Sequence, residues 1–374
     1  MTDLFVGNRD HANLPRKMNF SICGCRDDCA HAELNDIGLS PAIVDGRVAF
    51  NLRLAGAVGP WGNQHAWLLG RLDPSQVVET CRHIIEIYRD HGPREARNKA
   101  RLRFLVADWG LDRFRAELER RTGFALAPAG TEETRPGPYR DHIGVHPQRQ
   151  YGRYYVGLMV PAGRLLLEQA EGLCRLATRY GSGELRLTTG QNVIMPHVPG
   201  GMLTDLLAES LPYELTPFPP PFMRGMVACT GNAFCSFALI DTKERGRELA
   251  EELDRRFDTD EFDELQGGLR IHVSGCPNSC GLHQVADIGL LGKKVKVDGA
   301  LVEGCDVFLG GRMGLDGAFG MRELQNVTFA EVPDLVEGIA RAYLAERREG
   351  EPFRDWCIRG GRVAAGEAGQ AVAH

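Results

Sequence analysis

The sequence predicts an α+β fold that contains an internal duplication. Residues 24–39 and residues 275–290, 251 positions later, are identical at seven of sixteen positions, including two cysteines and a final Asp-Ile-Gly-Leu. Short alternating apolar segments typical of strands flank both copies, and segments with helical apolar spacing lie elsewhere in the chain. Repeated strand, loop and strand units with separate helices favour an α+β architecture around a pseudo-twofold core.

The amino-terminal part is expected to hold the first repeat over residues 1–72 and a helical connector over residues 73–125. Apolar alternation predicts strands at residues 18–22, 37–44 and 49–54. Apolar residues at helical spacing predict helices at residues 77–88, 94–106 and 109–121. Residues 50–56 and 308–314 are expected to continue the repeat at a slightly different offset.

The rest of the chain is expected to form a ferredoxin-like half-domain over residues 126–210, a second repeat over 211–350 and a disordered tail over 351–374. The half-domain begins with a Pro- and Gly-rich linker at 126–147. Its predicted strands are 154–160, 185–188 and 192–196, and its predicted helices are 164–179 and 203–208. In the second repeat, strands are predicted at 269–274, 285–290 and 306–309, and helices at 243–257 and 334–346.

Composition excludes several functional classes. A net charge of −6 and 25% charged residues do not indicate a nucleic-acid partner. The sequence has neither a signal-peptide pattern nor an apolar segment long enough to span a membrane, so we expect a soluble, cytoplasmic protein. Eleven cysteines in such a chain are expected to include ligands rather than a disulfide framework.

Four cysteines stand in two closely spaced pairs. Cys229 and Cys235 are separated by five residues, and Cys276 and Cys280 by three. Four thiolates are the number that a 4Fe-4S cluster needs, and the five-residue spacing is loose for a zinc site. A structural zinc site and four unrelated buried thiols remain the alternatives.

The motifs around these cysteines resemble the siroheme-dependent sulfite and nitrite reductases. They are VACTGNAFC from Val227 and HVSGCPNSCG from His272, together with RLTTGQN at 186–192, HPQRQ at 146–150 and LPRKMN at 14–19. The resemblance runs in the right order from about residue 14 to residue 314 and implies a duplicated siroheme/4Fe-4S reductase fold. It also implies a 4Fe-4S cluster on the four cysteines, with Cys280 bridging to the siroheme iron as its axial thiolate.

Siroheme carries a ring of carboxylates, so the resemblance implies a pocket rich in cationic and amide side chains. The residues expected to contact the cofactor are Arg16, Lys17, Arg224, Asn232, Arg270, Asn278, Cys280 and Arg312. Lys243 also lies in a matching motif. The alternative for each basic side chain is a solvated surface charge.

The family motif at residues 14–19 implies the catalytic residues, Lys17 and Asn19, on the substrate side of the cofactor. Lys17 is expected to bind the anion and donate protons. Position 19 resembles Lys in sulfite reducers and Asn in many nitrite reducers, and a dianion gains more from a second ammonium than a monoanion does. Asn19 therefore favours nitrite, with sulfite as the alternative substrate and a strand-edge asparagine as the structural one.

No flavin or nicotinamide motif occurs, so a separate electron donor of the ferredoxin type is expected. Basic residues of the connector are candidates for docking it, with a solvated helix face as the alternative. They are Arg94, Arg97, Lys99 and Arg101.

The chain departs from the family pattern at its start. Full-length relatives begin with another ferredoxin-like half that contributes two substrate-contacting arginines, and that half is expected to be absent here. The resemblance therefore predicts six-electron reduction of nitrite to ammonia, with a catalytically impaired cofactor-binding or electron-transfer fragment as an alternative. The related precorrin-3B synthase is a further alternative, which the basic motif at residues 14–17 disfavours.

Further residues of the two Cys loops have expected roles. Cys23, Cys25 and Cys29 are interpreted as relics of the duplication packed in the core, because Cys25 and Cys29 align with Cys276 and Cys280. His272 and His283 are expected either to hydrogen-bond the cofactors or to be satisfied core histidines. Asp287, which repeats Asp36, is expected to accept hydrogen bonds from backbone amides.

Overall fold

The structure is a computed structural model that describes residues 1–132, 141–209, 215–257, 268–314 and 316–360. The chain divides into two compact units. Unit 1 comprises Met1–Gly137 and Met313–Gly317, and unit 2 comprises Pro138–Arg312 and Ala318–His374. No described helix is both long and apolar enough to cross a membrane. The expected disordered tail at 351–374 is wrong for residues 351–360, which include the helix α11 (Phe353–Ile358) with its buried Trp356. The rest of that tail, from position 361 onward, lies outside the described residues.

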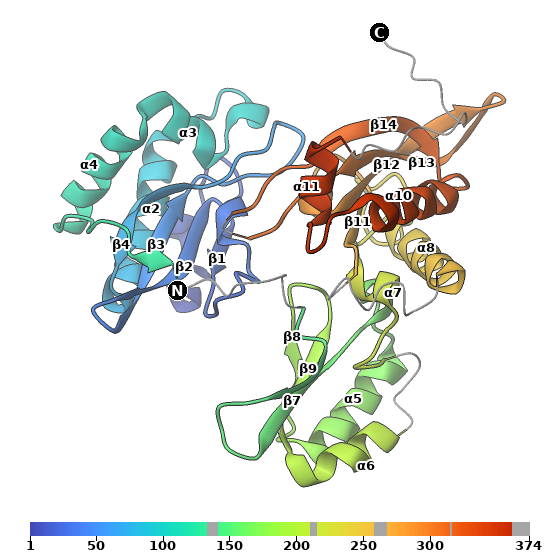
Figure 1. Ribbon diagram of the computed structural model, residues 1–374. Helices are drawn as coiled ribbons and strands as arrows, with labels where there is room; N and C mark the ends of the chain where they lie inside the picture. The colour runs from blue at the N-terminus through green and yellow to red at the C-terminus, as the bar shows by residue number, and fades with distance from the viewer. Residues whose placement is uncertain (133–140, 210–214, 258–267, 315, 361–374) are drawn as a thin grey trace. The chain divides into compact units, whose positions relative to one another are not determined.

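Unit 1 is built on a mixed sheet with the strand order β1-β2-β3-β4 (Figure 1). The strands are β1 (Phe20–Ile22), β2 (Ile37–Val44), β3 (Arg47–Leu54) and β4 (Trp67–Leu72), and β5 (Thr131–Glu132) also pairs with β2. β1 and β2 are parallel, whereas β3 is antiparallel to both of its neighbours. The predicted strands at 37–44 and 49–54 are confirmed, but β4 was not predicted.

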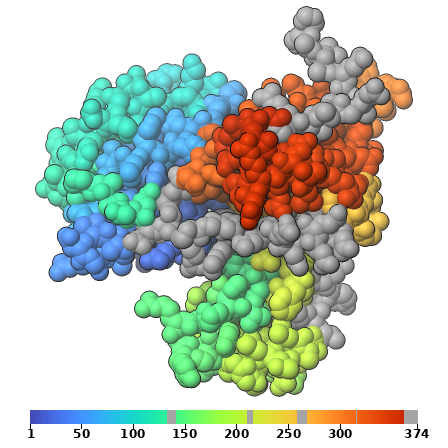
Figure 2. All heavy atoms as spheres, viewed as in Figure 1, coloured from blue at the N-terminus to red at the C-terminus, as the bar shows by residue number. Residues whose placement is uncertain are grey.

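Three helices cover the sheet of unit 1, and the outer two form a continuous layer in the space-filling view (Figure 2). They are α2 (Val77–His91), α3 (Leu102–Trp109) and α4 (Leu111–Thr122), and α1 (Thr2–Phe5) precedes the sheet. One apolar core joins sheet and helices through side chains such as Leu52, Ile84 and Phe114. The predicted helix at 94–106 is wrong in its first part, where only a 3-10 turn at Arg97–Lys99 precedes α3.

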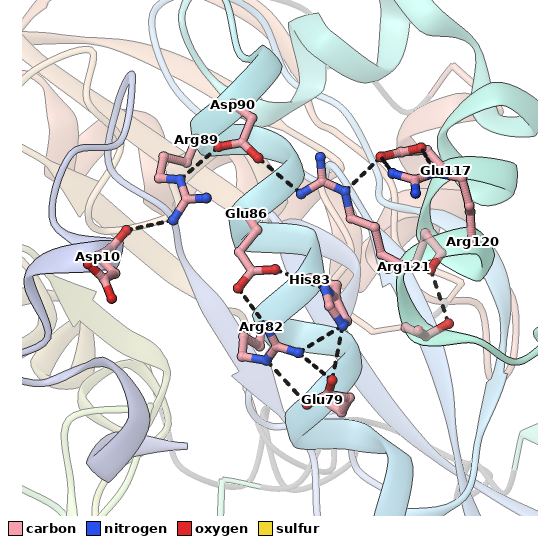
Figure 3. Close-up of polar contacts among 12 residues, drawn as sticks. Asp10, Glu79, Arg82, His83, Glu86, Arg89, Asp90, Glu117, Arg120 and Arg121 are labelled. Carbon is pink, nitrogen blue, oxygen red and sulfur yellow. Dashed lines mark hydrogen bonds and ion pairs between the residues drawn. The ribbon is translucent and has the colours of Figure 1, made fainter.

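Charged side chains link α2 and α4 on their outer faces (Figure 3). Arg121 on α4 contacts Asp90 of α2 at 3.0 Å and Glu117 of its own helix at 2.6 Å. Along α2, the ring nitrogens of His83 lie 3.0 Å from Glu79 and 2.9 Å from Glu86. These contacts are ion pairs and hydrogen bonds at a helix surface, where each stabilises the fold modestly.

Unit 2 contains a second mixed sheet, with the order β10-β11-β12-β13-β14. Its strands are β10 (Met226–Ala228), β11 (Ile271–Ser274), β12 (Ile288–Val297), β13 (Ala300–Leu309) and β14 (Met321–Thr328). Among the described residues, four helices belong to the same region, namely α7 (Pro221–Gly225), α8 (Thr242–Arg256), α10 (Val332–Glu346) and α11 (Phe353–Ile358). Side chains of the sheet and of all four helices share one core, in which Trp356 is fully buried.

Unit 2 also contains a four-stranded antiparallel sheet with its own core. The strands are β6 (Gly144–Pro147), β7 (Arg153–Leu158), β8 (Arg186–Leu187) and β9 (Val193–Pro199), in the order β6-β7-β9-β8. Two helices accompany them, α5 (Leu167–Tyr180) and α6 (Leu203–Ala208). The core joins α5 to the sheet through residues such as Leu173 and Met195. The predicted order of strands and helices between 154 and 208 is confirmed.

The two mixed sheets confirm the duplication at the level of register. Phe20 lies opposite Ile37 in the first sheet, and Ile271 lies opposite Ile288 in the second, a shift of 251 positions in both strands. After the first hairpin the shift becomes 255, because Leu54 pairs with Ile37 and Leu309 with Ile288. The expected match of residues 50–56 with 308–314 is therefore wrong by three positions. Both hairpins have a two-residue turn, but each strand of the second hairpin is two residues longer, which accounts for the change of shift from 251 to 255.

Candidate cofactor and active site

Both cysteine pairs of the second repeat follow neighbouring parallel strands. Cys229 comes directly after β10, and Cys276 comes two residues after β11. The N–H group of Cys229 donates to the carbonyl of Val273 at 3.0 Å, which extends the ladder between these strands by one residue. Because parallel strands end at the same edge of a sheet, both Cys loops begin side by side.

Backbone hydrogen bonds fold the loop with Cys229 and Cys235 against the loop with Cys276. The N–H of Cys235 donates to Gly231 at 3.0 Å, and the N–H of Leu239 donates to Gly275 at 2.8 Å. Gly231 has a φ of +74°, a conformation that favours glycine. A Cβ on Gly275 would lie 2.9 Å from the Cβ of Ala238, so glycine permits the close approach of the two loops.

Hydrogen-bond donors and a cation surround Cys229. The N–H of Gly275 points to its sulfur at 3.2 Å. The Thr242 hydroxyl donates to the Cys229 carbonyl at 2.6 Å and lies 3.5 Å from the sulfur. The Lys243 ammonium donates to the Ala162 carbonyl at 2.6 Å and to Gln191 Oε1 at 2.8 Å. Burial lowers the pKa of Lys243 to about 8, and the charge of Cys229 opposes that shift. This environment stabilises negative charge on sulfur.

The donor set fits a 4Fe-4S cluster. Cys229, Cys235 and Cys276 are half-buried and Cys280 is exposed, so all four thiols face the loop side of the sheet edge rather than the core. No three His, Cys, Asp or Glu side chains in the described ranges converge on a point that could hold one metal ion. A cluster does not require such convergence, because each thiolate binds a different iron.

The residues expected to be catalytic lie in unit 1, immediately before β1. Lys17 is exposed, and Asn19 is half-buried. The backbone of Asn19 is held on both sides, because its N–H donates to Asp36 Oδ2 at 2.8 Å and its carbonyl accepts the N–H of Ile37 at 3.1 Å. The carbonyl of Arg16 accepts a hydrogen bond from the Tyr88 hydroxyl on α2 at 3.4 Å. The segment is thus anchored to both the sheet and a helix.

Sequence analysis missed the residue that organises this anchor. Arg101, at the start of α3, donates to Asp36 through Nε at 3.1 Å and through Nη2 at 2.6 Å. The Asp36 side chain is fully buried, and Arg101 is largely buried with it. Burial raises the pKa of Asp36, and the charge and hydrogen bonds of Arg101 act against this shift. Asp36 therefore holds both Arg101 and the backbone of Asn19.

The proposed donor-docking patch on the connector must be corrected for two residues. Arg101 is occupied by Asp36, as described above. Arg94 donates to the side chain and carbonyl of Asn13 and to the carbonyl of Arg89. Arg97 and Lys99 are exposed. These four side chains were grouped as basic residues of a predicted helix at 94–106, and the segment is not a continuous helix.

The basic residues expected to bind cofactor carboxylates differ in their surroundings. Arg16 Nη1 is buried and has no hydrogen-bond partner within the described part of the chain, so it could donate a hydrogen bond to a bound anion. Arg224 already forms a two-point contact with Asp141 at 2.6 and 3.0 Å. Arg312 lies 3.7 Å from Asp355, and Arg270 donates its backbone N–H to Asp287. The side chains of Asn232 and Asn278 are exposed.

Several smaller expectations are also resolved. Asp287 accepts the N–H of Arg270 at 2.9 Å, as Asp36 does for Asn19, so its predicted role is confirmed. His283 is a satisfied core histidine, with Nδ1 3.2 Å from the Ser279 hydroxyl and a pKa that burial lowers to about 4. His272 is buried.

The first-repeat cysteines do not share one environment. Cys23 is buried as expected, but Cys25 and Cys29 are only half-buried. The prediction that all three pack in the core is therefore wrong for the latter pair. They lie in the loop after β1 and are not members of the apolar cluster of unit 1.

Family models match most of the chain. The model of the nitrite and sulphite reductase 4Fe-4S domain matches residues 1–126 and 221–362, on either side of a match at 146–213 to the nitrite/sulfite reductase ferredoxin-like half domain. The chain belongs to the nitrite and sulphite reductase family. The first match covers both repeats, and the second covers the antiparallel sheet of unit 2.

Relatives that are named as ferredoxin-dependent nitrite reductases support this membership. The chain is 44% identical over 346 residues to the ferredoxin–nitrite reductase of Synechococcus elongatus, covering 91% of this chain and 65% of that protein. It is 42% identical over 373 residues to the assimilatory ferredoxin-dependent nitrite reductase of Haloferax mediterranei, covering 95% and 63%. The chain thus spans just under two thirds of these relatives.

A solved structure agrees with the fold. The NirA protein of Mycobacterium tuberculosis matches with a TM-score of 0.88 and 34% identity, covering 96% of this chain and 65% of that one. The duplicated reductase fold expected from the motifs is therefore confirmed. Within it, the four cysteines expected to hold the cluster lie in unit 2, and Lys17 and Asn19 lie in unit 1.

Proposed function

We propose that this chain binds siroheme and a 4Fe-4S cluster and reduces nitrite to ammonia with electrons from a ferredoxin-type donor. The observation that carries the proposal is the placement of four thiols on two loops that leave the same edge of a parallel strand pair. The relatives that match nearly the whole chain are named as ferredoxin-dependent nitrite reductases, which supports the substrate and the donor.

Cys229, Cys235, Cys276 and Cys280 would hold the cluster, and the exposed thiol of Cys280 would also reach the siroheme iron. When bound, these groups supply one-electron transfer to a substrate that takes up six electrons. The chain's own contribution at the cluster is to neutralise charge. The N–H of Gly275 and the half-buried ammonium of Lys243 favour the more negative, reduced form.

At the substrate, Lys17 would bind the anion and supply protons. Its exposed ammonium follows Arg16, whose buried Nη1 is available to a carboxylate of the cofactor. The backbone contacts of Asn19 with Asp36 and Ile37 fix the direction of this segment. Preorganised charge of this kind needs no rearrangement as the oxyanion is reduced.

The neutral side chain of Asn19 supports nitrite over sulfite. Two ammonium groups, at positions 17 and 19, would stabilise a dianion more than a monoanion, and this chain carries only one of them. Sulfite reduction is the second candidate activity. The relatives' names do not favour it.

The test is to assay the wild type and Asn19→Lys with nitrite and with sulfite, using a chemically reduced dye as donor. The substitution keeps both backbone contacts of residue 19, so the variant should fold. We expect the ratio of sulfite to nitrite kcat/KM to rise at least about tenfold, since an added charge–charge contact is worth more than about 1.4 kcal/mol. An unchanged ratio would refute the role assigned to Asn19, and failure of both proteins to reduce nitrite would refute the activity.

A further inference from the structure

A pair of thiols in the first repeat is not used by the proposed reaction. The Sγ atoms of Cys25 and Cys29 lie 3.4 Å apart in the loop between β1 and the 3-10 turn at Ala32–Leu34. Both side chains are half-buried, so small molecules can reach them from solvent. The pair occupies the positions of Cys276 and Cys280 in the duplicated loop.

The first sheet does not offer this pair the partners that its counterparts have. In the second sheet, Cys229 and Cys235 follow β10, which lies beside β11. Among the described residues, the first sheet begins at β1, the counterpart of β11, and has no strand at the position of β10. The first repeat therefore has two thiols in contact, those of Cys25 and Cys29, where the second repeat has four cysteines on two neighbouring loops.

The contact between the two thiols lowers the pKa of Cys25 and raises the pKa of Cys29. The hydrogen bond with Cys29 is the main cause that lowers the pKa of Cys25 to about 6, assisted by the backbone N–H groups of Asp27 and Cys29. The same contact, together with burial, raises the pKa of Cys29. At neutral pH the pair therefore holds one proton, with the thiolate on Cys25.

Cys23, in the same loop, has the opposite surroundings. It is buried, its thiol donates to Asp28 Oδ1 at 2.7 Å, and burial with the Asp28 charge raises its pKa. A protonated thiol shielded from solvent is a poor nucleophile. The loop thus places a reactive pair next to an inert cysteine, which serves as an internal control.

We propose that Cys25 and Cys29 form a redox-active thiol pair that low-molecular-weight disulfides oxidise to an intramolecular disulfide. The Cys25 thiolate attacks one sulfur of the small disulfide and releases one small thiolate, which leaves a mixed disulfide on Cys25. Cys29 then loses its proton and attacks the Cys25 sulfur, releasing the second small thiol. Two protein thiols lose two electrons and two protons, and one small disulfide becomes two small thiols.

The sulfurs need to approach by little more than 1 Å to reach bonding distance, which side-chain rotation can supply. Neither cysteine is among the residues proposed to hold a cofactor or substrate, and both belong to unit 1.

The experiment incubates the purified chain with oxidised glutathione, blocks free thiols with iodoacetamide and analyses tryptic peptides by mass spectrometry. Trypsin cuts after Arg26, so the disulfide would join the peptides 18–26 and 27–47, and fragmentation would assign it to Cys25 rather than Cys23. We expect the joined peptides in the wild type and their loss after dithiothreitol. Cys29→Ser should instead stop at a glutathione adduct on Cys25, and the exposed single thiol of Cys174 provides the matched control.

The rate of alkylation gives a second readout that needs no variant. At pH 6, half of Cys25 would be thiolate against about 0.3% of an ordinary thiol, and the lower basicity offsets part of this advantage. We expect Cys25 to react about tenfold faster than N-acetylcysteine in the same solution. Joined peptides through Cys23, or Cys25 and Cys29 both remaining free after oxidised glutathione, would overturn the proposal.

Discussion

Replacing Asp36 by asparagine tests whether the buried contact with Arg101 holds the Lys17 segment in place. The substitution keeps an oxygen that can accept the N–H of Asn19 but removes the charge that faces the guanidinium. A buried ion pair that loses one partner typically costs 3–5 kcal/mol, and the retained acceptor places this case near about 3 kcal/mol. For a chain of 374 residues, that loss lowers the melting temperature by about 4 °C.

The assay is a double-mutant cycle of Asp36→Asn, Arg101→Met and the double variant, measured by urea denaturation. Because the double variant leaves neither charge unpaired, it should be less destabilised than the sum of the single variants by at least about 1.5 kcal/mol. Asp36→Asn should also raise the KM for nitrite, since it loosens the anchor of Lys17 and Asn19. Additive losses would refute the reasoning, because they would show that Asp36 and Arg101 act independently.

Two further predictions concern other charged contacts. Lys243→Met should lower the reduction potential of the cluster by tens of millivolts, because it removes a half-buried cation beside Cys229. A redox titration followed by electron paramagnetic resonance measures the potential, and an unchanged value would contradict the prediction. Arg120 and Arg121 lower the pKa of Glu117 to about 2 by hydrogen bonds and charge (Figure 3). The unfolded pKa is about 4.3, so the ionised Glu117 side chain stabilises the folded state above that pH. This stabilisation is lost as the pH falls to about 2. Glu117→Gln should therefore destabilise the protein by up to about 1 kcal/mol at pH 7 and by nothing near pH 2, and denaturation curves that differ equally at both pH values would exclude this origin.

The duplication was predictable because the two repeats share a short motif with the same internal spacing. Seven identities in residues 24–39 and 275–290 give the same strand register in both sheets. The strands that apolar patterning missed, such as β4 and β14, do not show clean alternation of buried and exposed residues. In β4 the neighbours Leu69 and Gly70 are both buried, and no residue of β14 is buried. The three-residue error in continuing the repeat arose for a related reason, since the β-hairpins differ in length.

The assignment of Cys229, Cys235, Cys276 and Cys280 to the cluster stays a prediction from spacing and motifs, and the surroundings of these cysteines could not be predicted from the sequence. Gly275, Thr242 and Lys243 reach Cys229 through hydrogen bonds and charge that depend on how two loops fold against each other. The role of Arg101 could not be predicted from the sequence. In the sequence it is one of four basic residues near a helix, and only the tertiary contact with Asp36, 65 residues away, gives it a distinct role.

The most direct test of the central claim is the metal content and ultraviolet-visible spectrum of the chain, purified without oxygen from a host that makes siroheme. The account predicts haem bands together with cluster absorbance, and sulfide and iron in the ratio of one 4Fe-4S cluster plus one haem iron. Cys235→Ser should lose the cluster absorbance, whereas Cys174→Ser should keep it. A wild-type chain that contains zinc instead of iron and sulfide, or that carries a cluster without haem bands, would contradict the account.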